Sequence, residues 1–501
     1  MSIEAIQGLI QAGKLEAAWR GLQALQKNEP GNVRVLRLSV WVQQRTGQLK
    51  GACDTIERIV QLAPVGEDFV ELAGLKAQLG HGAELLGLAE KALLAGMQGE
   101  AGFERLAAVL QAEGFSEKAI EILRAALERF PDSAQLREAL GSQHLLLAQF
   151  DQAQSQYERA LIRGQRSAKS YWLEAHMDDQ GSLHDEKRIP ELVARMGQGN
   201  TDEQIYLGFA LGRCCERLER YGEAFRYFDK ACRLVHSGLN YKVEAGAREL
   251  KEIAKRTQLQ PLNQDVTKPA KIPRPIFIVG MPRTGTTLVS RMLSQIDSVQ
   301  YLGELKQISS MMRPFLMGRM SVKQVRDAYL AFIVSKSQQN THFVIDDMPL
   351  NFINLGLILS AFPEAIVVDM RRNPVDTSMA CFKTLFAPAA GAFTYSLADV
   401  GNYYCHYLAH LKQFESERCI ELEYEQLVCQ PKLALTPILD AMGCEWEEKV
   451  MTFSRDKSSV ASASSVQVRR PLHQQSLGYV DRYGERLDPL VSIFKENDID
   501  F

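Results

Sequence analysis

The feature that most constrains the fold of this 501-residue chain is a repeat of about 34 residues in its first half. Turn positions recur at Gly13, Gly47, Gly80, Gly114 and Ala148, at steps of 34, 33, 34 and 34 residues. Amphipathic segments such as EGFSEKAIEILRAALERFP follow the turns. Two short helices cannot bury their apolar faces alone, so such units stack on one another, and the period predicts a helical solenoid.

The period and the helix–turn–helix pattern resemble the tetratricopeptide repeat. A degenerate further copy is visible at RLERYGEAFRYFDKACRLV, so we expect the solenoid to cover residues 1–255. Stacked helix pairs form a concave surface, which in such arrays binds a peptide or another protein. The alternative is that the array only supports the second domain or mediates self-association.

The composition excludes several classes of protein. The chain is 46% hydrophobic with a net charge of −3, so nothing draws it as a whole toward nucleic acid or a membrane surface. The nine cysteines contain no CxxC pair, which favours free thiols in a reducing compartment. The N-terminal residues have no signal-peptide pattern, and no apolar run is long enough to span a bilayer. We therefore expect a cytoplasmic protein whose partners include neither nucleic acid nor membrane.

The sequence pattern changes after a proline-rich linker at residues 256–273. Short apolar segments, PIFIVG, HFVID, AIVVDM and CIELEY, then alternate with segments of helical length over residues 274–501. This alternation predicts an α/β domain with a parallel sheet covered by helices. Ligands of such sheets bind at the carboxyl ends of the strands, here after Val279, Ile345 and Met370.

The loop GMPRTGTT follows the first of these strands and has the glycine spacing of a phosphate-binding loop, at Gly280 and Gly285. Thr286 occupies the place of the lysine of nucleotide triphosphatases, and Thr287 follows. Backbone N–H groups at a helix N-terminus still form an anion cradle, and Arg283 supplies a positive charge from inside the loop. The loop therefore suits one phosphate that bears a transferable group better than a triphosphate–metal complex.

Four segments in order resemble a known family. PIFIVGMPRTGTTLVSRML resembles the 5′-phosphosulfate loop of sulfotransferases that use 3′-phosphoadenosine 5′-phosphosulfate (PAPS), and VVDMRRNPVDTSMACFKTLF resembles their 3′-phosphate motif. LEYEQLVCQPKLALTPILDAMG and SSVQVRRPLHQQSLGYVDRYGERLDPL resemble later segments, and together they cover nearly all of residues 274–490. The chain is similar to bacterial fusions of tetratricopeptide repeats with a sulfotransferase of the tyrosylprotein branch. The resemblance implies an α/β phosphate-loop fold, PAPS as co-substrate and no metal.

The resemblance also implies roles for individual residues. Arg283 would lie against the sulfonate and the departing 5′-phosphate, and Glu304 would act as general base on the acceptor hydroxyl. Lys306 would steady the sulfonate, and His342 is a second choice as base. The residues that it assigns to PAPS binding are Arg283, Thr284, Gly285, Thr286, Thr287, Arg372, Ser378 and Arg469, with Arg372 on the 3′-phosphate.

Three positions depart from the family pattern. Many relatives have a serine at the place of Ala380, for which Ser378 is the nearest substitute. A lysine is common where this chain has Asp347, and a tryptophan where it has Val480. An acid inside an anion site would oppose binding, so these departures leave room for a divergent or inactive member.

The sequence therefore supports a PAPS-dependent sulfotransferase that modifies a hydroxyl, with the repeats favouring tyrosine in a polypeptide and a small molecule or glycan as alternatives. A second hypothesis is an interaction scaffold with a degenerate sulfotransferase-like domain, supported by Asp347 and Ala380. A third, a metal-dependent kinase or nucleotide triphosphatase, is disfavoured by the missing loop lysine.

Overall fold

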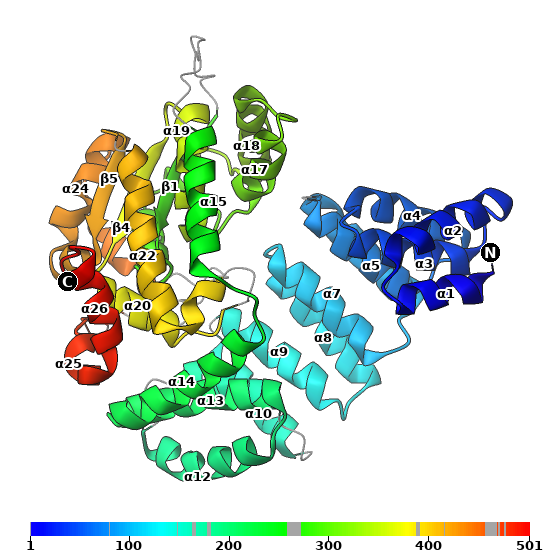
Figure 1. Ribbon diagram of the computed structural model, residues 1–501, viewed down its shortest axis with the longest axis horizontal. Coiled ribbons are helices and arrows are strands. Elements are labelled where there is room, and N and C mark those ends of the chain that lie inside the picture. The colour runs from blue at the N-terminus through cyan, green and yellow to red at the C-terminus, as the bar shows by residue number, and fades with distance from the viewer. Residues whose placement is uncertain are drawn as a thin grey trace. The chain divides into compact units, whose positions relative to one another are not determined.

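The computed structural model describes residues 2–79, 81–147, 149–162, 167–177, 182–257, 272–386, 391–414, 416–455, 468, 471–474 and 477–501. Its contacts divide the chain into two compact units, Met1–Arg166 and Ser167–Phe501. Figure 1 draws the first unit in blue to cyan, and the second from cyan-green to red. Each unit is described by itself.

The first unit is an array of helix pairs, which confirms the predicted all-α solenoid. Three of the predicted turns adopt the left-handed conformation that favours glycine, with φ of 70° at Gly13, 73° at Gly47 and 84° at Gly114. Gly80 and Ala148 lie outside the described residues. The helices are α1 (Ile3–Gln11), α2 (Leu15–Asn28), α3 (Val33–Arg45), α4 (Leu49–Leu62), α5 (Gly66–Gln78), η1 (Gly82–Glu84), α6 (Leu85–Ala95), α7 (Glu100–Ala112), α8 (Ser116–Arg129), α9 (Ala134–Leu146) and α10 (Phe150–Ile162).

Five helices of the second unit precede the sheet: α11 (Ala168–Met177), α12 (Ser182–Gln198), α13 (Thr201–Arg217), α14 (Tyr221–Ser237) and α15 (Val243–Arg256). Their apolar residues share one core with the sheet, and Phe225 of α14 stacks on Phe382 with ring centroids 5.9 Å apart. By compactness these helices belong with the α/β part of the chain. The predicted domain boundaries, at residues 255 and 274, stay predictions.

The predicted parallel sheet is confirmed. Five parallel strands lie in the order β2-β3-β1-β4-β5. The strands are β1 (Arg274–Gly280), β2 (Val299–Tyr301), β3 (Phe343–Asp346), β4 (Ile366–Arg371) and β5 (Cys419–Glu423). Four of them correspond to the apolar segments of the sequence, whereas β2, only three residues long, was not predicted.

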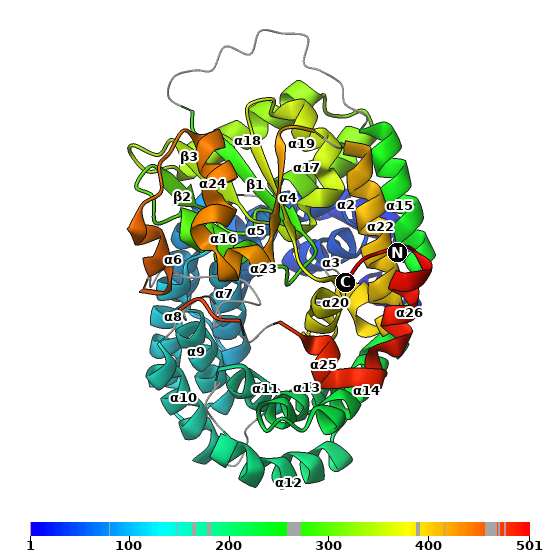
Figure 2. The ribbon, with the colours of Figure 1, turned by 90° about the vertical axis from the view of Figure 1, so that its left-hand side faces the viewer.

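Helices cover both faces of the sheet, as Figure 2 shows. Along β1, Ile276 and Ile278 belong to the core under α16 and α24, whereas Phe277 and Val279 belong to the core under α18, α19 and α22. These and the remaining helices are α16 (Thr286–Leu293), α17 (Gln307–Leu316), α18 (Val322–Lys336), η2 (Pro349–Asn354), α19 (Leu355–Ala361), α20 (Pro374–Phe382), η3 (Ala392–Tyr395), α22 (Leu397–Leu411), η4 (Lys412–Phe414), α23 (Tyr424–Cys429), α24 (Pro431–Met442), η5 (Glu448–Arg455), α25 (Tyr479–Tyr483), η7 (Gly484–Leu487) and α26 (Asp488–Glu496).

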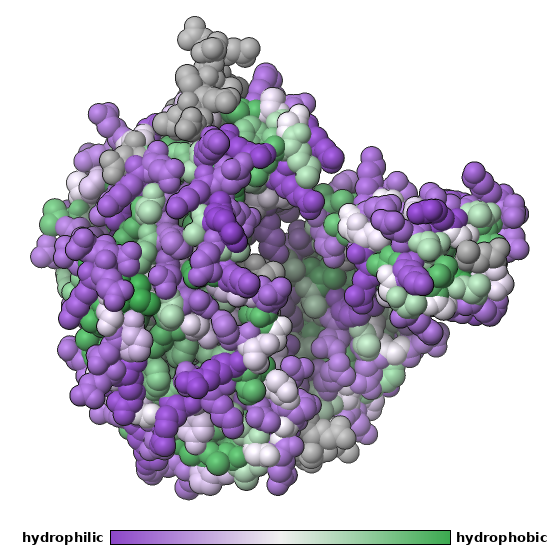
Figure 3. Space-filling view, in the orientation of Figure 1, coloured by the Kyte–Doolittle hydropathy of each residue, from purple (hydrophilic) through white to green (hydrophobic). Residues whose placement is uncertain are grey.

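The exposed surface and the cysteines of the structure agree with what the composition indicates. The face drawn in Figure 3 is mostly polar, with apolar residues scattered among hydrophilic ones. In the part of the chain that the structure describes, no helix combines the length and the apolar character needed to cross a bilayer. All nine cysteines are free thiols.

Candidate functional site

The loop between β1 and α16 needs glycine at both of its ends. Gly280 has a φ of 151°, and a Cβ there would lie 2.5 Å from the carbonyl oxygen of Met370. Gly285 has a φ of 107°, and a Cβ there would lie 2.7 Å from the ring of Tyr424. Neither position tolerates a side chain without movement of its neighbour, so the glycine spacing of the sequence reflects close backbone approach to β4 and α23.

The three loop threonines are buried, and two of them have visible partners. Thr284 donates its hydroxyl to the carbonyl oxygen of Met281 at 2.8 Å, which closes the loop on itself. Thr287, in the first turn of α16, hydrogen-bonds the carboxylate of Asp347. Thr286 is the first residue of α16. In this structure the hydroxyls of Thr284 and Thr287 therefore stabilise the loop itself.

Arg283 adopts a backbone conformation that is uncommon for a residue with a side chain, with a φ of 70°. Such conformations cost about 1–3 kcal/mol and cluster at functional sites. The residue is half-buried, and desolvation lowers the pKa of its guanidinium from an ordinary value so high that the group stays charged. The thiol of Cys381 donates to the carbonyl oxygen of Pro282 at 3.1 Å and so holds the loop beside Arg283.

The structure brings Arg372 to this loop. The residue follows β4 and is 6% exposed, and its Nη1 donates to the carbonyl oxygen of Arg283 at 2.9 Å. Its guanidinium carbon lies 4.9 Å from the ring centroid of Tyr424 and 5.7 Å from that of Tyr479. The two arginines that the sequence assigned to separate phosphates thus belong to one cluster, in which Arg372 braces the loop that carries Arg283.

Glu304 follows β2 at the same end of the sheet. The residue is exposed, yet the protein packed around its carboxyl group raises its pKa, and the charges of Asp347 and Asp346 raise it further, to about 8. The positive charges of Lys306 and Arg283 oppose this rise. The field of Arg283 reaches Glu304, so the two predicted catalytic residues lie within electrostatic range of each other.

The other predicted positions have mixed outcomes. Ser378 is fully buried on α20, and its hydroxyl has no hydrogen-bond partner among the residues that the structure describes. Arg469 lies outside those residues. His342 immediately precedes β3, at the amino end of the strand, so it lies at the opposite end of the sheet from the loop and does not suit the role of a base.

Asp347, at the end of β3, is fully buried. Tyr301 donates its hydroxyl to Oδ2 of Asp347 at 3.2 Å, and Ser290 and Thr287 of α16 also hydrogen-bond the carboxylate. Burial raises the pKa of this carboxyl to about 6, and the hydrogen bonds limit the rise. The acid at this position is therefore built into the packing of the loop helix against β3.

The sequence analysis missed a buried group beside Arg372. Lys383 donates to the hydroxyl of Tyr479 at 2.8 Å, and its ammonium lies 4.0 Å from the centroid of that ring. Lys383 also pairs with Glu216 of α13, which accepts a hydrogen bond from the hydroxyl of Tyr483 at 2.9 Å. These residues come from three separate parts of the sequence, and no local pattern marks them as a group.

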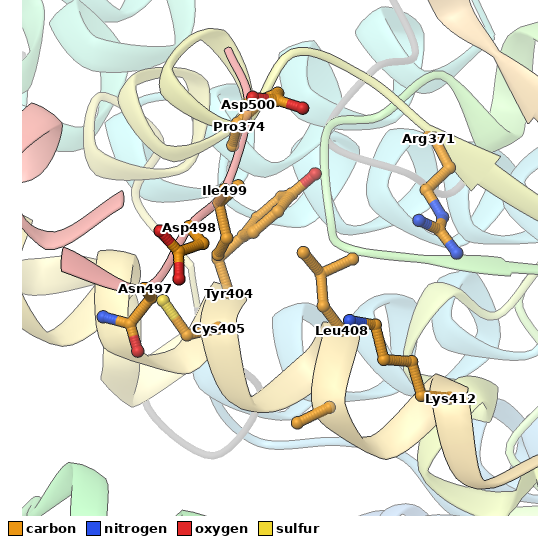
Figure 4. A pocket seen from close by; sticks show the side chains of 11 residues that line it. Arg371, Pro374, Tyr404, Cys405, Leu408, Lys412, Asn497, Asp498, Ile499 and Asp500 are labelled. Atoms are coloured by element: carbon orange, nitrogen blue, oxygen red, sulfur yellow. The ribbon is translucent and has the colours of Figure 1, made fainter. Parts of the chain in front are cut away.

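A pocket of about 450 Å³ lies beside Arg371, the last residue of β4 (Figure 4). Arg371 of β4 and Lys412 line it, together with Tyr404 and the C-terminal residues Asn497 to Asp500. Tyr404 donates its hydroxyl to the carbonyl oxygen of Arg372 at 3.1 Å. The pocket contains none of the predicted site residues.

The described residues include no group of three or more His, Cys, Asp or Glu side chains close enough to hold a metal ion. The absence of a metal, which the resemblance implied, stays a prediction.

The fold and the loop define an α/β domain with an anion-binding loop at the carboxyl end of its central strand. Residues 275–328 and 317–448 match the sequence model of the Sulfotransferase family, so this part of the chain is a sulfotransferase family domain.

Three relatives illustrate the likeness. An uncharacterized protein of Aquifex aeolicus (strain VF5) is 26% identical over 409 residues, 76% of this chain and 52% of that protein, so this chain spans about half of its length. The sulfotransferase domain of the Synechococcus PCC 7002 olefin synthase is 16% identical, covers 49% of this chain and 99% of its own, and has a TM-score of 0.36. MamA is 18% identical, covers 33% of this chain and 95% of its own, and has a TM-score of 0.29. Because these TM-scores are low, the family assignment rests on the sequence match.

Proposed function

We propose that this protein is a PAPS-dependent sulfotransferase that transfers a sulfuryl group to a hydroxyl acceptor. The observation that carries the proposal is the meeting of Arg283 and Arg372 at a glycine loop within a sulfotransferase family domain. Two guanidinium groups at the N-terminal end of α16 suit a ligand with several anionic groups better than a neutral one.

The roles follow from this placement. The loop from Arg283 to Thr287 would hold the 5′-phosphosulfate, with Arg283 stabilising the oxygens that gain charge as the bond between sulfur and the phosphate oxygen breaks. Arg372 would serve the 3′-phosphate, and Ser378 and Arg469 remain proposed nucleotide contacts. Glu304 would take the proton of the acceptor hydroxyl as the new sulfur–oxygen bond forms. A base with a pKa of about 8 is well matched to this task near neutral pH.

The acceptor in this proposal is a tyrosine side chain of a peptide or protein held by the repeats. The support is the solenoid itself, since arrays of this kind bind polypeptides along their concave face. A hydroxyl of a small molecule or glycan is the alternative. The free thiols agree with a cytoplasmic location.

One observation favours a second candidate, an interaction scaffold with an inactive sulfotransferase-like domain. Asp347 places a buried carboxylate against the first turn of the loop helix, where a negative charge opposes an anionic ligand. Binding of adenosine 3′,5′-bisphosphate without any release of it from PAPS, whatever the hydroxyl acceptor, would favour this candidate.

The test is calorimetric binding of adenosine 3′,5′-bisphosphate to the full chain, beside ATP, with and without magnesium. We expect binding that exceeds that of ATP and falls in Arg372→Ala, because loss of hydrogen bonds to a charged group costs about 1.5–3 kcal/mol, or roughly 10- to 150-fold in affinity. Arg371→Ala is the matched control, since the neighbouring Arg371 pairs with Asp369 at 2.6 Å and lines the pocket of Figure 4 instead. No binding by the wild-type protein, or equal losses in both variants, would refute the proposal.

A further inference from the structure

The segment that carries Glu304 continues the pairing of β2 with β3 beyond the end of both strands. Leu302 donates its N–H to the carbonyl oxygen of Ile345 at 3.1 Å, and Asp347 donates its N–H to the carbonyl oxygen of Gly303 at 3.3 Å. Glu304 is thus fixed on its N-terminal side by two backbone hydrogen bonds. The φ of Gly303 is 86°, so the chain turns sharply just before Glu304.

Asp346 fixes the segment on the other side. Its Oδ1 accepts the backbone N–H groups of Leu305 and Met348, each at 3.2 Å. Its Oδ2 accepts the hydroxyl of Tyr329 at 3.1 Å and Nδ2 of Asn351 at 3.2 Å. The carboxylate is fully buried and uses both oxygens fully. It therefore joins the residue after Glu304 to β3, α18 and η2 at once.

We propose that Asp346 is a positioning residue for the sulfuryl transfer. It holds the carboxylate of Glu304 at a fixed position relative to the phosphate loop. The inference rests on the proposed function, because it takes Glu304 as the base. Asp346 itself touches no reacting atom: it is 0% exposed and its four hydrogen bonds saturate it.

The physical reason is the sensitivity of proton transfer to geometry. A base must lie within hydrogen-bond reach of the proton it takes, and a misplacement of about 1 Å costs about 100-fold in rate. Glu304 is exposed to solvent and follows a sharp turn, so the position of its carboxylate depends strongly on how its backbone is held. The hydrogen bond from Leu305 to Asp346 supplies that restraint one residue away.

The structure offers a variant pair that separates positioning from other roles. In Asp346→Asn, the amide oxygen can still accept from Leu305, but its NH₂ group meets the NH₂ group of Asn351. Adding Asn351→Asp restores an acceptor there, and the new carboxylate can also accept from Asn354, which already donates to residue 351 at 3.1 Å. The double variant keeps the net charge and can keep the number of hydrogen bonds, because the hydroxyl of Tyr329, which donates to residue 346 in the wild-type protein, can accept from the NH₂ group introduced there. It moves the carboxylate from residue 346 to residue 351.

We would measure turnover of PAPS, as release of adenosine 3′,5′-bisphosphate with a tyrosine-containing peptide as acceptor, together with calorimetric binding of the bisphosphate. We expect Asp346→Asn to lower kcat about 10- to 100-fold with KM for PAPS and bisphosphate affinity unchanged, and the double variant to recover most of the loss. Unchanged kcat in the single variant, a parallel loss of bisphosphate binding, or no recovery in the double variant would overturn the inference.

A readout without turnover separates this inference from the proposed function. Hydrogen exchange of the peptide that contains Leu305 should be slow in the wild-type protein and faster in Asp346→Ala, while peptides of β4 stay unchanged. Equal exchange in both proteins would overturn the positioning role even if PAPS turnover is found. Failure of the wild-type protein to bind the bisphosphate would instead refute the proposed function, whatever the exchange result.

Discussion

Glu216 is the buried charge whose removal we expect to destabilise the C-terminal unit most clearly. Its carboxylate pairs with Lys383 and accepts the hydroxyl of Tyr483 at 2.9 Å on Oε1, and Arg213 lies 2.8 Å from Oε2. The Glu216 side chain is 11% exposed and that of Lys383 is 9% exposed. The substitution Glu216→Gln keeps the shape of the side chain and leaves both cations without their shared carboxylate.

Two lines of reasoning give the loss of stability that we expect for Glu216→Gln. Burial by itself would raise the pKa of Glu216, but Lys383 and Arg213 outweigh burial and lower it from 4.5 to about 2. That interval corresponds to about 3 kcal/mol, at roughly 1.4 kcal/mol per pKa unit. Removal of one partner of a buried ion pair typically costs about 3–5 kcal/mol. We therefore expect the free energy of unfolding of the C-terminal unit to fall by about 3 kcal/mol in Glu216→Gln.

The pH dependence has a definite sign. Because the pKa of Glu216 in the folded protein lies below its ordinary value, its stabilisation is complete above a pH of about 4.5 and is lost as the pH falls toward about 2. The difference in stability between wild type and Glu216→Gln should therefore be constant near neutral pH and should narrow below a pH of about 4.5.

The assay is guanidinium unfolding of the full chain, followed by hydrogen exchange of peptides from α13, which report on the C-terminal unit alone. Glu186→Gln is the control, because its pair with Arg220 is exposed, with side-chain exposures of 60% and 42%. Exposed pairs contribute at most about 1 kcal/mol. If Glu216→Gln destabilises no more than Glu186→Gln, the reasoning from the buried charges is wrong.

Three further predictions concern the site and the unit that holds it. Turnover of PAPS should rise with pH through about 8, since Glu304 must be ionised to act as base. Glu304→Gln should lower turnover about 100-fold and abolish this rise, and an unaltered pH profile in the variant would exclude the assigned role. Gly285→Ala, at a φ of 107°, should weaken binding of adenosine 3′,5′-bisphosphate, measured by calorimetry, about 5- to 150-fold, the effect of about 1–3 kcal/mol of strain. Gly197→Ala, in open space on α12, should leave the affinity unchanged, and equal affinities in the two variants would contradict the loop geometry. A fragment of residues 167–501 should give a cooperative thermal transition by circular dichroism. A fragment of residues 274–501 should aggregate, because it lacks the helices that share a core with the sheet; if this shorter fragment is folded and soluble, the shared core is disproved.

The sequence predicts well those features that depend on neighbouring residues. The turns at Gly13, Gly47 and Gly114 have the left-handed backbone that glycine favours, so the spacing of these glycines directly gives the period of the repeat. In the loop, Gly280 and Gly285 are required by close approach of backbone and ring, which also leaves a mark at fixed spacing. Such local requirements are readable without knowledge of the rest of the chain.

Contacts between distant segments are not readable in this way. Glu216 and Lys383 are 167 residues apart, and Lys383 and Tyr479 are 96 apart. The apolar pattern of α13 indicates which face of the helix is buried but does not identify the element that this face contacts. The repeat pattern therefore gave no sign that α13 packs in the second unit. The strand β2 was missed for a related reason, since three residues that pair only with β3 carry too little periodicity.

Asp347 illustrates how the meaning of a residue depends on its surroundings. From the sequence, an acidic residue near the phosphate loop is expected to oppose the binding of an anion, because its side chain is assumed to face the ligand. In the structure its carboxylate accepts hydrogen bonds from Tyr301 and from Thr287 of the loop helix, so part of its role is to pack α16 against β3. The sequence alone does not distinguish these two orientations.

The cations around Tyr479 bear on how a loop without its lysine can hold an anion. Among the described residues, Arg372, Lys383 and Arg482 lie 5.7, 4.0 and 5.6 Å from the centroid of this ring. Like charges in a poorly solvated site repel one another, and the carboxylates of Glu216, which pairs with Lys383, and Asp376, which accepts the backbone N–H of Tyr479 at 2.7 Å, offset part of this repulsion. An anionic nucleotide bound beside them would relieve this repulsion, so its binding should also raise the stability of the C-terminal unit. In this arrangement the segments that follow β4, together with α25, supply the positive charge that a loop lysine would supply. The loop itself can then contact its ligand through its backbone.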